Sequence, residues 1–162
     1  MKSKKIKQAV ITSLFIIVPA AFFFIFRFSV VDGQSMENTY KNGDVLIVYS
    51  FGKPERNDII AFEGHYKGGT DKNMIKRVIA VGGDTVDIDF DKNEVYVNGK
   101  KIDEPYIKEQ EFESEGRQFP CTLEDDELFV MGDNRNHSTD GRSSDLEPVR
   151  LKDVKGTVLF KL

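Results

Sequence analysis

Ser35 is the residue of this chain whose surroundings most suggest chemistry. It stands in Val31-Asp-Gly-Gln-Ser-Met36, a polar stretch that follows a long apolar run. A serine hydroxyl becomes a nucleophile only when a base accepts its proton and nearby donors stabilise the oxyanion that forms. The chain offers two candidate bases, Lys76 and His137. The fold must therefore bring one of these two side chains to Ser35.

Lys76 opens an apolar stretch, Arg77-Val-Ile-Ala-Val81, that has the pattern of a buried strand. Because side chains alternate along a strand, Lys76 and Arg77 point to opposite faces, and we expect only one of them to enter the core. An amine buried at an apolar surface has a pKa lowered by up to about 3–5 units, so it can act as a base near neutrality. The local pattern by itself favours a lysine that keeps its amine in water.

A polar loop, Gly132-Asp-Asn-Arg-Asn-His-Ser-Thr-Asp-Gly-Arg142, follows the apolar residues 128–131. So many charged and polar groups directly after a core strand must satisfy one another or form a site. Asp140 and Arg142 could pair and stiffen the loop, and Ser138 could bond a neighbouring amine. A hydrogen-bonded turn without a function is the simpler interpretation.

His137, in the same loop, is the rival base. Ser35, His137 and Asp140 would supply the residue types of a Ser-His-Asp triad, and their spacing in sequence does not exclude one. The residues alone therefore leave both Lys76 and His137 open as the base.

The composition argues against other kinds of site. The single cysteine, Cys121, cannot form an intramolecular disulfide, and with two histidines it makes no convincing zinc site. Residues 87–94 alternate acidic side chains, but Lys92 and Asn98 stand where a calcium loop needs Gly and Glu, so we interpret them as a hairpin turn. We expect no metal and no cofactor.

The charge distribution divides the chain into two parts. Residues 1–28 hold five basic side chains and no acidic ones, which leaves 18 basic and 27 acidic side chains for residues 29–162. An acidic domain lacks the basic footprint of a nucleic-acid-binding protein, so we expect no nucleic acid as a partner.

The N-terminal part predicts a membrane anchor. Residues 9–26 carry no charge, with lysines before them and Arg27 after them, and no small-x-small cleavage site follows. We interpret residues 1–28 as a basic cytoplasmic end and an uncleaved transmembrane helix, rather than a cleaved signal, and residues 29–162 as an extracytoplasmic domain. Ser35 lies eight residues past Arg27 and therefore within about 30 Å of the bilayer.

The domain after the anchor has the period-two pattern of strands. The fold class that this predicts is mainly β, with antiparallel sheets that form a partly closed barrel or a pair of sheets. Asn98-Gly99 predicts a tight hairpin. The segment 105–127 is polar and acidic, and we expect it to cross the surface without a catalytic role. The predicted strands are 45–49, 58–62, 76–81, 85–89, 94–97, 128–131 and 157–160.

Four motifs in order, behind an N-terminal anchor, resemble the bacterial type I signal peptidases. They are Gly33-Gln-Ser-Met36, Gly43-Asp-Val-Leu46, Lys76-Arg-Val-Ile-Ala-Val-Gly-Gly-Asp84 and the loop from Gly132 to Arg142. The resemblance implies that Ser35 is the nucleophile and that Lys76, rather than a histidine, is the general base.

The same resemblance assigns further residues. Ser138 matches the serine that orients the lysine amine, while Asp140 and Arg142 match the charged pair that holds the loop. Asp133 belongs to the structural start of that loop. His137 then has no catalytic role.

The sequence departs from the family pattern in two places around Ser35. Some members carry an oxyanion hydroxyl where this chain has Gly33, so we expect the Ser35 amide, helped by the Gly33 amide, to hold the oxyanion. Asn38 and Tyr40 replace a proline and a leucine. Because proline presets its φ angle, its loss is expected to loosen this turn by about 0.4–1 kcal/mol.

The resemblance implies a membrane-anchored serine endopeptidase that removes signal peptides from exported preproteins. It further implies small substrate residues at the first and third positions before the cut. The partners expected are preproteins and membrane lipid, and the protein is expected to be a monomer. Two alternatives remain: a non-catalytic relative that assembles surface structures, and a self-cleaving Ser-Lys protease of the repressor type.

Overall fold

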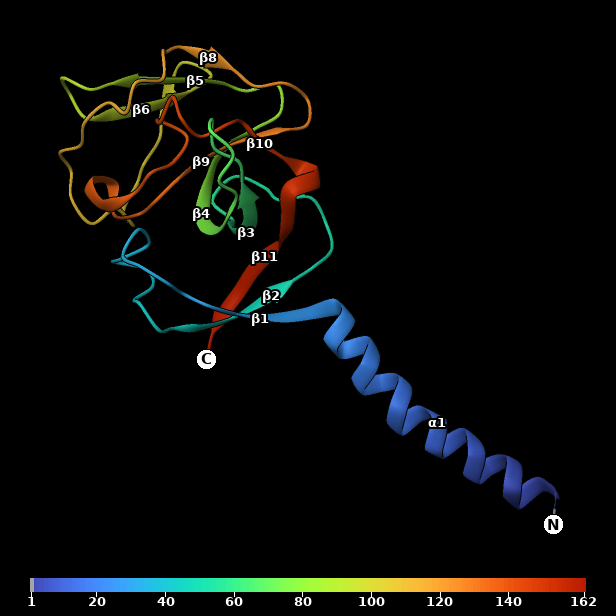
Figure 1. The fold of residues 1–162 in the computed structure, drawn as a ribbon. Helices are drawn as coiled ribbons and strands as arrows, with labels where there is room; N and C mark the ends of the chain where they lie inside the picture. The colour runs from blue at the N-terminus through green and yellow to red at the C-terminus, as the bar shows by residue number, and fades with distance from the viewer. Residues whose placement is uncertain (1) are drawn as a thin grey trace.

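A computed structural model describes residues 2–162, except for the side chains of residues 2–6, 9, 10 and 21. The chain begins with helix α1 (Lys2–Ile25), which passes without a loop into strand β1 (Phe26–Val30). Figure 1 shows α1 extending away from a β-rich body that contains the rest of the chain. Apart from α1, the described helices are two short 3-10 turns, η1 (Arg135–His137) and η2 (Leu151–Asp153).

The β-rich body consists of two antiparallel sheets. The larger sheet has the order β1-β2-β11-β3-β4-β9-β10, and the smaller has the order β7-β6-β5-β8. The additional strands of the larger sheet are β2 (Val45–Tyr49), β3 (Ile59–Gly64), β4 (Lys72–Val81), β9 (Glu127–Met131), β10 (Val149–Arg150) and β11 (Val154–Lys161). The smaller sheet contains β5 (Thr85–Asp89), β6 (Glu94–Val97), β7 (Lys100–Lys101) and β8 (Cys121–Thr122).

The two sheets do not close into a barrel. Within residues 2–162, β1 and β10 remain the edges of the larger sheet, because β5 to β8 pair only with one another. The mainly β, antiparallel prediction is confirmed. The partly closed barrel is not formed, and the alternative of a pair of sheets describes the fold.

Strand β4 is an inner strand of the larger sheet and contributes side chains both to the core of that sheet and to the cluster under the smaller sheet. It pairs with β3 on one side and with β9 on the other, and a bulge opposite β9 lies between Val78 and Ala80. Val78 packs in the core of the larger sheet, whereas Ile79 and Ala80 pack in the cluster under the smaller sheet. One strand therefore fixes Lys76 and Arg77 relative to both sheets.

Most predicted strands are found at or close to the expected residues. The hairpin at Asn98-Gly99 is also confirmed: both residues have positive φ, 53° and 73°, and β6 pairs with β7 across them. Strand β1 was missed because its aromatic residues extend the apolar run of the predicted anchor. It pairs with β2 along its whole length, so it belongs to the sheet.

The predicted membrane anchor falls on α1. In the part of the chain that is described, no helix has both the length and the apolar character of a membrane span. Three positions of the predicted span, residues 9, 10 and 21, have side chains outside the description.

Candidate active site

Ser35 lies in a turn that the 132–142 loop fixes from outside. The turn leaves β1 with Val31 and buries Met36, which is 1% exposed, in the core beneath it. The amide of Asn134 donates to the Ser35 carbonyl at 3.0 Å, and the Asn134 side chain donates to the Gln34 carbonyl at 3.0 Å. The loop thus sets the position of the Ser35 backbone, and the hydroxyl is left directed toward β4.

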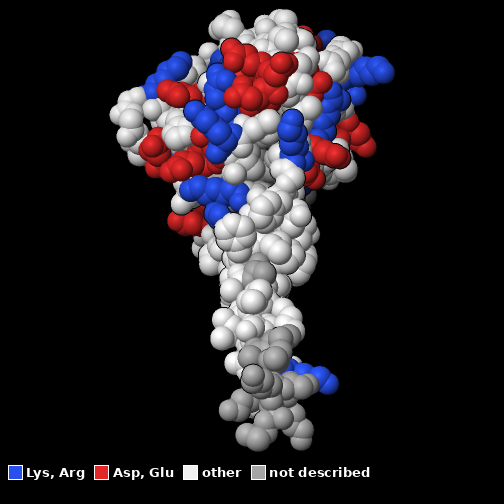
Figure 2. Space-filling model, turned by 90° about the vertical axis from the view of Figure 1, so that its right-hand side faces the viewer, with Lys and Arg blue, Asp and Glu red and all other residues white. Residues whose placement is uncertain are grey.

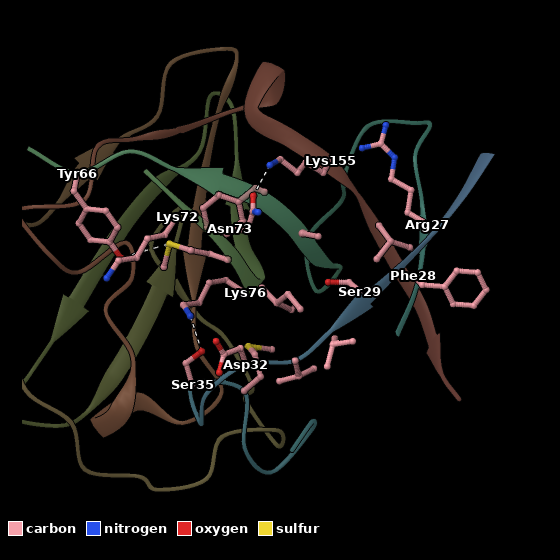
Figure 3. Close-up of a pocket in the computed structure, with 18 residues that line it drawn as sticks. Arg27, Phe28, Ser29, Asp32, Ser35, Tyr66, Lys72, Asn73, Lys76 and Lys155 are labelled. Carbon is pink, nitrogen blue, oxygen red and sulfur yellow. Dashed lines mark hydrogen bonds between the residues drawn. The ribbon is translucent and has the colours of Figure 1, made fainter. Parts of the chain in front are cut away.

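Lys76 is the side chain that meets the Ser35 hydroxyl. Its Nζ lies 2.6 Å from Ser35 Oγ (Figure 3), and the lysine is only 4% exposed. Among the described residues, no carboxylate lies within 4.0 Å of this amine. Burial lowers the pKa of Lys76 to about 8, with the charge of Asp140 acting in the opposite direction. The amine is therefore close to Ser35 and can be neutral near physiological pH.

Arg77 points to the other face of β4, as the alternation of side chains predicts. Our expectation that only one of the two cations enters the core is wrong, since Arg77 is only 9% exposed. Its guanidinium holds the fully buried Asp133 through two bonds of 2.9 and 2.7 Å, and it stacks 4.0 Å from the Tyr106 ring centroid. A bidentate carboxylate makes burial of this second cation possible.

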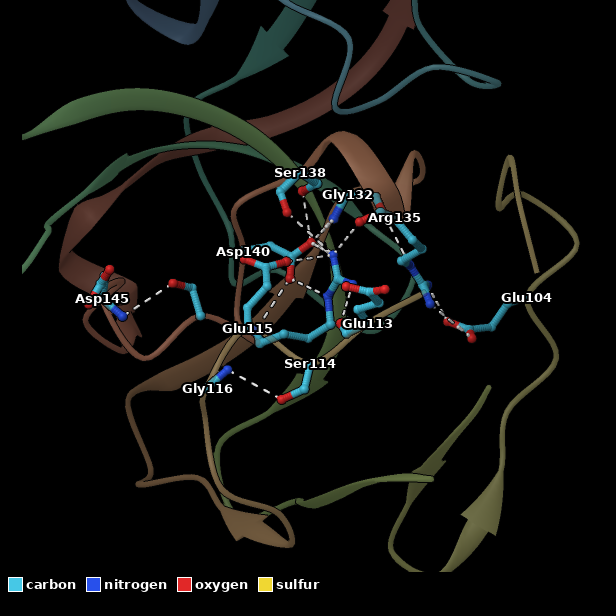
Figure 4. A network of polar contacts seen from close by, with 12 residues as sticks. Glu104, Glu113, Ser114, Glu115, Gly116, Gly132, Arg135, Ser138, Asp140 and Asp145 are labelled. Atoms are coloured by element: carbon cyan, nitrogen blue, oxygen red, sulfur yellow. Dashed lines mark hydrogen bonds and ion pairs between the residues drawn. The ribbon is translucent and has the colours of Figure 1, made fainter. Parts of the chain in front are cut away.

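Asp140 is the centre of the 132–142 loop. It is fully buried and accepts hydrogen bonds from the Gly132 amide at 2.9 Å, from Ser138 Oγ at 2.8 Å and from the Arg142 guanidinium at 2.9 and 3.0 Å. Burial opposes ionisation, but Arg142 beside it holds the pKa of the Asp140 carboxyl below its ordinary value. The predicted pairing of Asp140 with Arg142 is present and rigidifies the loop. Figure 4 shows Asp140 close to its partners Gly132 and Ser138.

Gly132 lets the loop approach Ser35 closely. A Cβ at this position would lie 2.3 Å from Ser138 Oγ and 2.5 Å from the Ser35 carbonyl oxygen, which no side chain can tolerate. The Ser138 hydroxyl is therefore beside the nucleophile's backbone and donates to Asp140. Its predicted role of orienting the lysine amine stays a prediction, because the hydrogen bond found is to Asp140.

No described hydrogen bond joins His137 to Ser35 or Lys76. The histidine is exposed at the end of η1 and lines a different cavity, which the 105–127 segment borders. The carboxylate of Asp140 is already bonded to Ser138, Gly132 and Arg142. The Ser-His-Asp arrangement is thus not assembled among the described residues.

The backbone amides around Ser35 differ in availability. The Gly33 amide donates to Asn42 Oδ1 at 2.8 Å, and Gly33 has a φ of 98° that favours glycine. Within the described residues, the Ser35 amide has no acceptor. It is the free donor for an oxyanion, and Gly33 could contribute only by leaving Asn42.

Asn38 does not loosen the turn after Ser35. Its φ of 85° is a left-handed conformation that proline, fixed near −65°, cannot adopt. Its side-chain amide donates to the Tyr106 carbonyl at 3.2 Å. The expected loosening is wrong because asparagine fits this backbone and ties it to the 105–127 segment. Tyr40, the second departure, packs against the core cluster that contains Met36.

A cavity of about 450 Å³ opens at Ser35 and Lys76 and continues between β1 and β4 (Figure 3). Apolar side chains such as Ala61, Phe62 and Ile75 line its interior. Arg27, Lys72 and Lys155 line the part away from Ser35. Its walls are two strands and its end is the Ser35 hydroxyl, so an extended peptide between the strands would present a carbonyl to that hydroxyl.

The 105–127 segment contributes to this site, which its sequence did not predict. Glu115 lies 2.9 Å from the Arg142 guanidinium, and the Lys108 amide donates to the Asp133 carbonyl at 2.9 Å. The segment had no periodic pattern and no motif, and only its acidic charge hinted at a partner among the arginines. In the described residues, no group of His, Cys, Asp or Glu side chains is arranged to hold a metal ion.

Comparison with known proteins places this geometry in a family. Residues 4–162 match the family described as signal peptidase, peptidase S26. Signal peptidase I of Bacillus licheniformis is 36% identical over 148 residues, which cover 85% of this chain and 76% of that protein. Signal peptidase I S of Bacillus subtilis is 37% identical over 149 residues, which cover 85% of this chain and 77% of that protein.

A solved structure agrees with these relatives. The crystal structure of a signal peptidase I from Enterococcus faecalis is 30% identical in sequence and superposes with a TM-score of 0.52. The match covers 68% of this chain and all of that chain.

Proposed function

This chain belongs to the signal peptidase family, peptidase S26, and from that premise we propose that it cleaves signal peptides from preproteins with a Ser35–Lys76 dyad. The activity itself, that of a type I signal peptidase and serine endopeptidase, follows from the family. The observation that carries the proposed dyad is the 2.6 Å contact between Lys76 Nζ and Ser35 Oγ in a buried setting.

Acylation begins from the neutral amine. Ser35 Oγ attacks the carbonyl carbon of the scissile bond while its proton moves to Lys76 Nζ, which gives a tetrahedral oxyanion and an ammonium. The ammonium then donates that proton to the leaving nitrogen as the C–N bond breaks. The product is an ester between Ser35 and the signal peptide, and the mature protein leaves with a new amino terminus.

Deacylation uses the same base. Lys76, neutral again, takes a proton from water, which attacks the ester carbonyl. The proton returns to Ser35 Oγ when the ester bond breaks, so the enzyme is regenerated and no cofactor takes part.

We assign the role of hydrogen-bond donor to the oxyanion to the Ser35 amide. A preorganised donor at such a site typically contributes about 10²–10³-fold to the rate. Support comes from the lack of an acceptor for this amide among the described residues, whereas the Gly33 amide is engaged by Asn42. We assign supporting roles to four further residues. Ser138 orients the lysine amine, and the pair of Asp140 and Arg142 holds the 132–142 loop. Asp133 supports the start of that loop.

We also propose that the chain is anchored in the bacterial cell membrane by residues 9–26, with the N-terminus in the cytoplasm and residues 29–162 outside. The sequence supports this with an uncharged run that lysines precede. Figure 2 adds that charged side chains cover the β-rich body but not the adjoining part of α1. Along α1, Phe15, Phe23 and Phe24 are more than 60% exposed.

An aromatic cluster marks where the proposed anchor meets the domain. Phe22 contacts Phe26, Phe24 contacts Phe51, and Tyr49 contacts both Phe26 and Phe51, with centroids 4.9–6.0 Å apart. Aromatic side chains gather at membrane interfaces, where their rings lie at the level of the headgroups. Extraction of membranes at alkaline pH would test the anchor, and release of the protein would contradict it.

The dyad is tested with a preprotein and the full-length protein in detergent. Wild type should cut the preprotein once, after its signal peptide, and Ser35→Ala and Lys76→Ala should leave it intact. His137→Ala serves as the matched control and should cut normally. Loss of activity in the His137 variant with retention in the Lys76 variant would overturn the assignment of the base. No cutting by wild type would favour a non-catalytic relative. The monomer and the absence of a nucleic-acid partner remain predictions from the sequence.

A further inference from the structure

Glu115 reaches the buried charges behind Lys76 from a segment without any family motif. Residues 114–117 run beside residues 142–144: the Arg117 amide donates to the Arg142 carbonyl at 3.0 Å, and the Ser144 amide donates to the Glu115 carbonyl at 3.0 Å. This backbone pairing fixes the Glu115 carboxylate 2.9 Å from the Arg142 guanidinium. Figure 4 shows Glu115 beside Asp140.

The cluster around Lys76 contains one more carboxylate than its arginines can neutralise. Asp133 is paired with Arg77. Asp140 and Glu115 share the single guanidinium of Arg142. When Glu115 is ionised, this side of Lys76 therefore has a net negative charge, which favours the ammonium form. When Glu115 is protonated, the charges balance and the amine loses its proton more readily.

We propose that Glu115 is a positioning residue of the active site, which acts through Arg142 and Asp140 to set the pH at which Lys76 becomes a base. The inference rests on the proposed function of Lys76. Glu115 itself touches neither the serine nor the substrate groove in the described structure.

The charged groups that face both residues can be named. Asp140, Glu115 and Asp133 act to keep Lys76 protonated, and Arg142 acts against this. Burial and the charge of Asp140 raise the pKa of Glu115 to about 7, while Arg142, a hydrogen bond from the Asp140 backbone and Lys76 lower it. The remaining neighbour is the phenol of Tyr66, whose pKa is raised chiefly by burial.

Glu115 and Lys76 consequently titrate as a coupled pair. As the pH rises, ionisation of Glu115 makes removal of the Lys76 proton harder. The increase of activity with pH therefore extends over a wider pH range than the titration of a single group would give. Removing the Glu115 charge should narrow this acid limb of the activity profile and move it to lower pH.

The test is the pH profile of kcat/KM between pH 6 and 10, measured with a fluorogenic signal-peptide substrate and the full-length protein in detergent. Glu115→Gln keeps the shape of the side chain and removes its charge. Its acid limb should have the slope of a single proton and reach its plateau roughly 0.5–1 pH unit lower than in wild type. The gain in activity should be largest between about pH 7 and 8 and should vanish toward about pH 6, where Glu115 of wild type is itself protonated. KM should change little, because Glu115 does not line the groove.

Two variants separate this role from a merely structural one. Glu115→Asp retains the charge and should restore the wild-type limb. Glu113→Gln removes an equal charge from an exposed side chain two residues away and should leave the profile unchanged. An unchanged limb in Glu115→Gln, or an equal loss of activity at every pH, would overturn the inference.

A readout without catalysis keeps the two proposals distinguishable. The ¹³Cε signal of Lys76, assigned by its loss in Lys76→Ala, should titrate at lower pH in Glu115→Gln than in wild type. If that titration is the same in both proteins while Lys76→Ala abolishes cleavage, only the role of Glu115 is wrong. If Lys76→Ala cleaves normally, the proposed function itself fails.

Discussion

Lys76 and Arg77 are neighbours on β4, both are buried, and their surroundings are opposite. Arg77 is held by a bidentate carboxylate, which neutralises its charge. An aromatic ring stacks on its guanidinium and fills the space beside it. Lys76 has only a serine hydroxyl within hydrogen-bond distance in the described structure, and burial lowers its pKa. One face of the strand thus contains a cation that is stabilised, and the other contains an amine that is destabilised as a cation.

The difference shows that a buried basic side chain can have a structural or a catalytic role, depending on whether its charge is paired. A paired buried charge is costly to break, since the partner is left uncompensated. An unpaired buried amine lowers stability and is retained where its lowered pKa serves the reaction. The contrast predicts that substitutions on the two faces affect different measurable quantities.

The largest effect is expected for Lys76→Met. Loss of the base should reduce kcat/KM by about 10³-fold or more, while the free energy of unfolding at pH 7 should rise by roughly 1–3 kcal/mol, because no ammonium needs to be buried. Peptide cleavage and urea unfolding in detergent measure the two quantities. A variant that loses both activity and stability would show that Lys76 is part of the structural core.

Arg77→Met should have the reverse signature. It leaves Asp133 fully buried without a partner, so the free energy of unfolding should fall by about 3–5 kcal/mol. The midpoint of urea unfolding is the measurement, and activity per folded molecule should fall much less than in Lys76→Met. The double variant Arg77→Met with Asp133→Leu should recover part of the stability, and failure to recover any would argue against the pairing as the cause.

The pH dependence of stability distinguishes the two faces more finely. The pKa of Lys76 is lowered from 10.5 to about 8, so between these values the unfolded chain binds more protons than the folded one, and stability rises with pH. The full rise is on the order of 3 kcal/mol. Urea unfolding between pH 7.5 and 10.5 should reveal it as a difference between wild type and Lys76→Met, and parallel curves would refute it.

His137→Ala should have the smallest effect. The imidazole is exposed, and the described hydrogen bonds of the Ser35 site do not include it, so kcat/KM should stay within about twofold of wild type. The same preprotein assay measures this. A large loss would return the histidine to the list of candidate bases.

Local pattern was sufficient where a feature depends on neighbouring residues. The alternation of apolar residues in 85–89 and 94–97 and the Asn98-Gly99 turn located the strands β5 and β6 and their hairpins. The opposite orientations of Lys76 and Arg77 follow from strand geometry alone. The proximity of Lys76 to Ser35 came from the resemblance, because local pattern favoured an exposed amine.

The features that sequence did not predict depend on partners far away in the chain. Burial of Arg77 requires Asp133, which is 56 residues distant. The 105–127 segment has no periodic pattern of its own, and the role of its Glu115 depends on the contact with Arg142. The pairing of β5 to β8 among themselves, rather than as further strands of a barrel, is likewise a choice between distant partners that period-two patterns do not distinguish.

The direct passage from α1 into β1 has a consequence for where cleavage occurs. No loop intervenes after Ile25, and β1 itself borders the groove that leads to Ser35. With α1 in the bilayer as proposed, five strand residues at about 3.3 Å each form a stiff spacer of roughly 17 Å between the lipid and the turn of the nucleophile. The length of this spacer would then select the cleavage site by its distance from the membrane. A preprotein would be cut where its chain has emerged from the bilayer by about the length of β1.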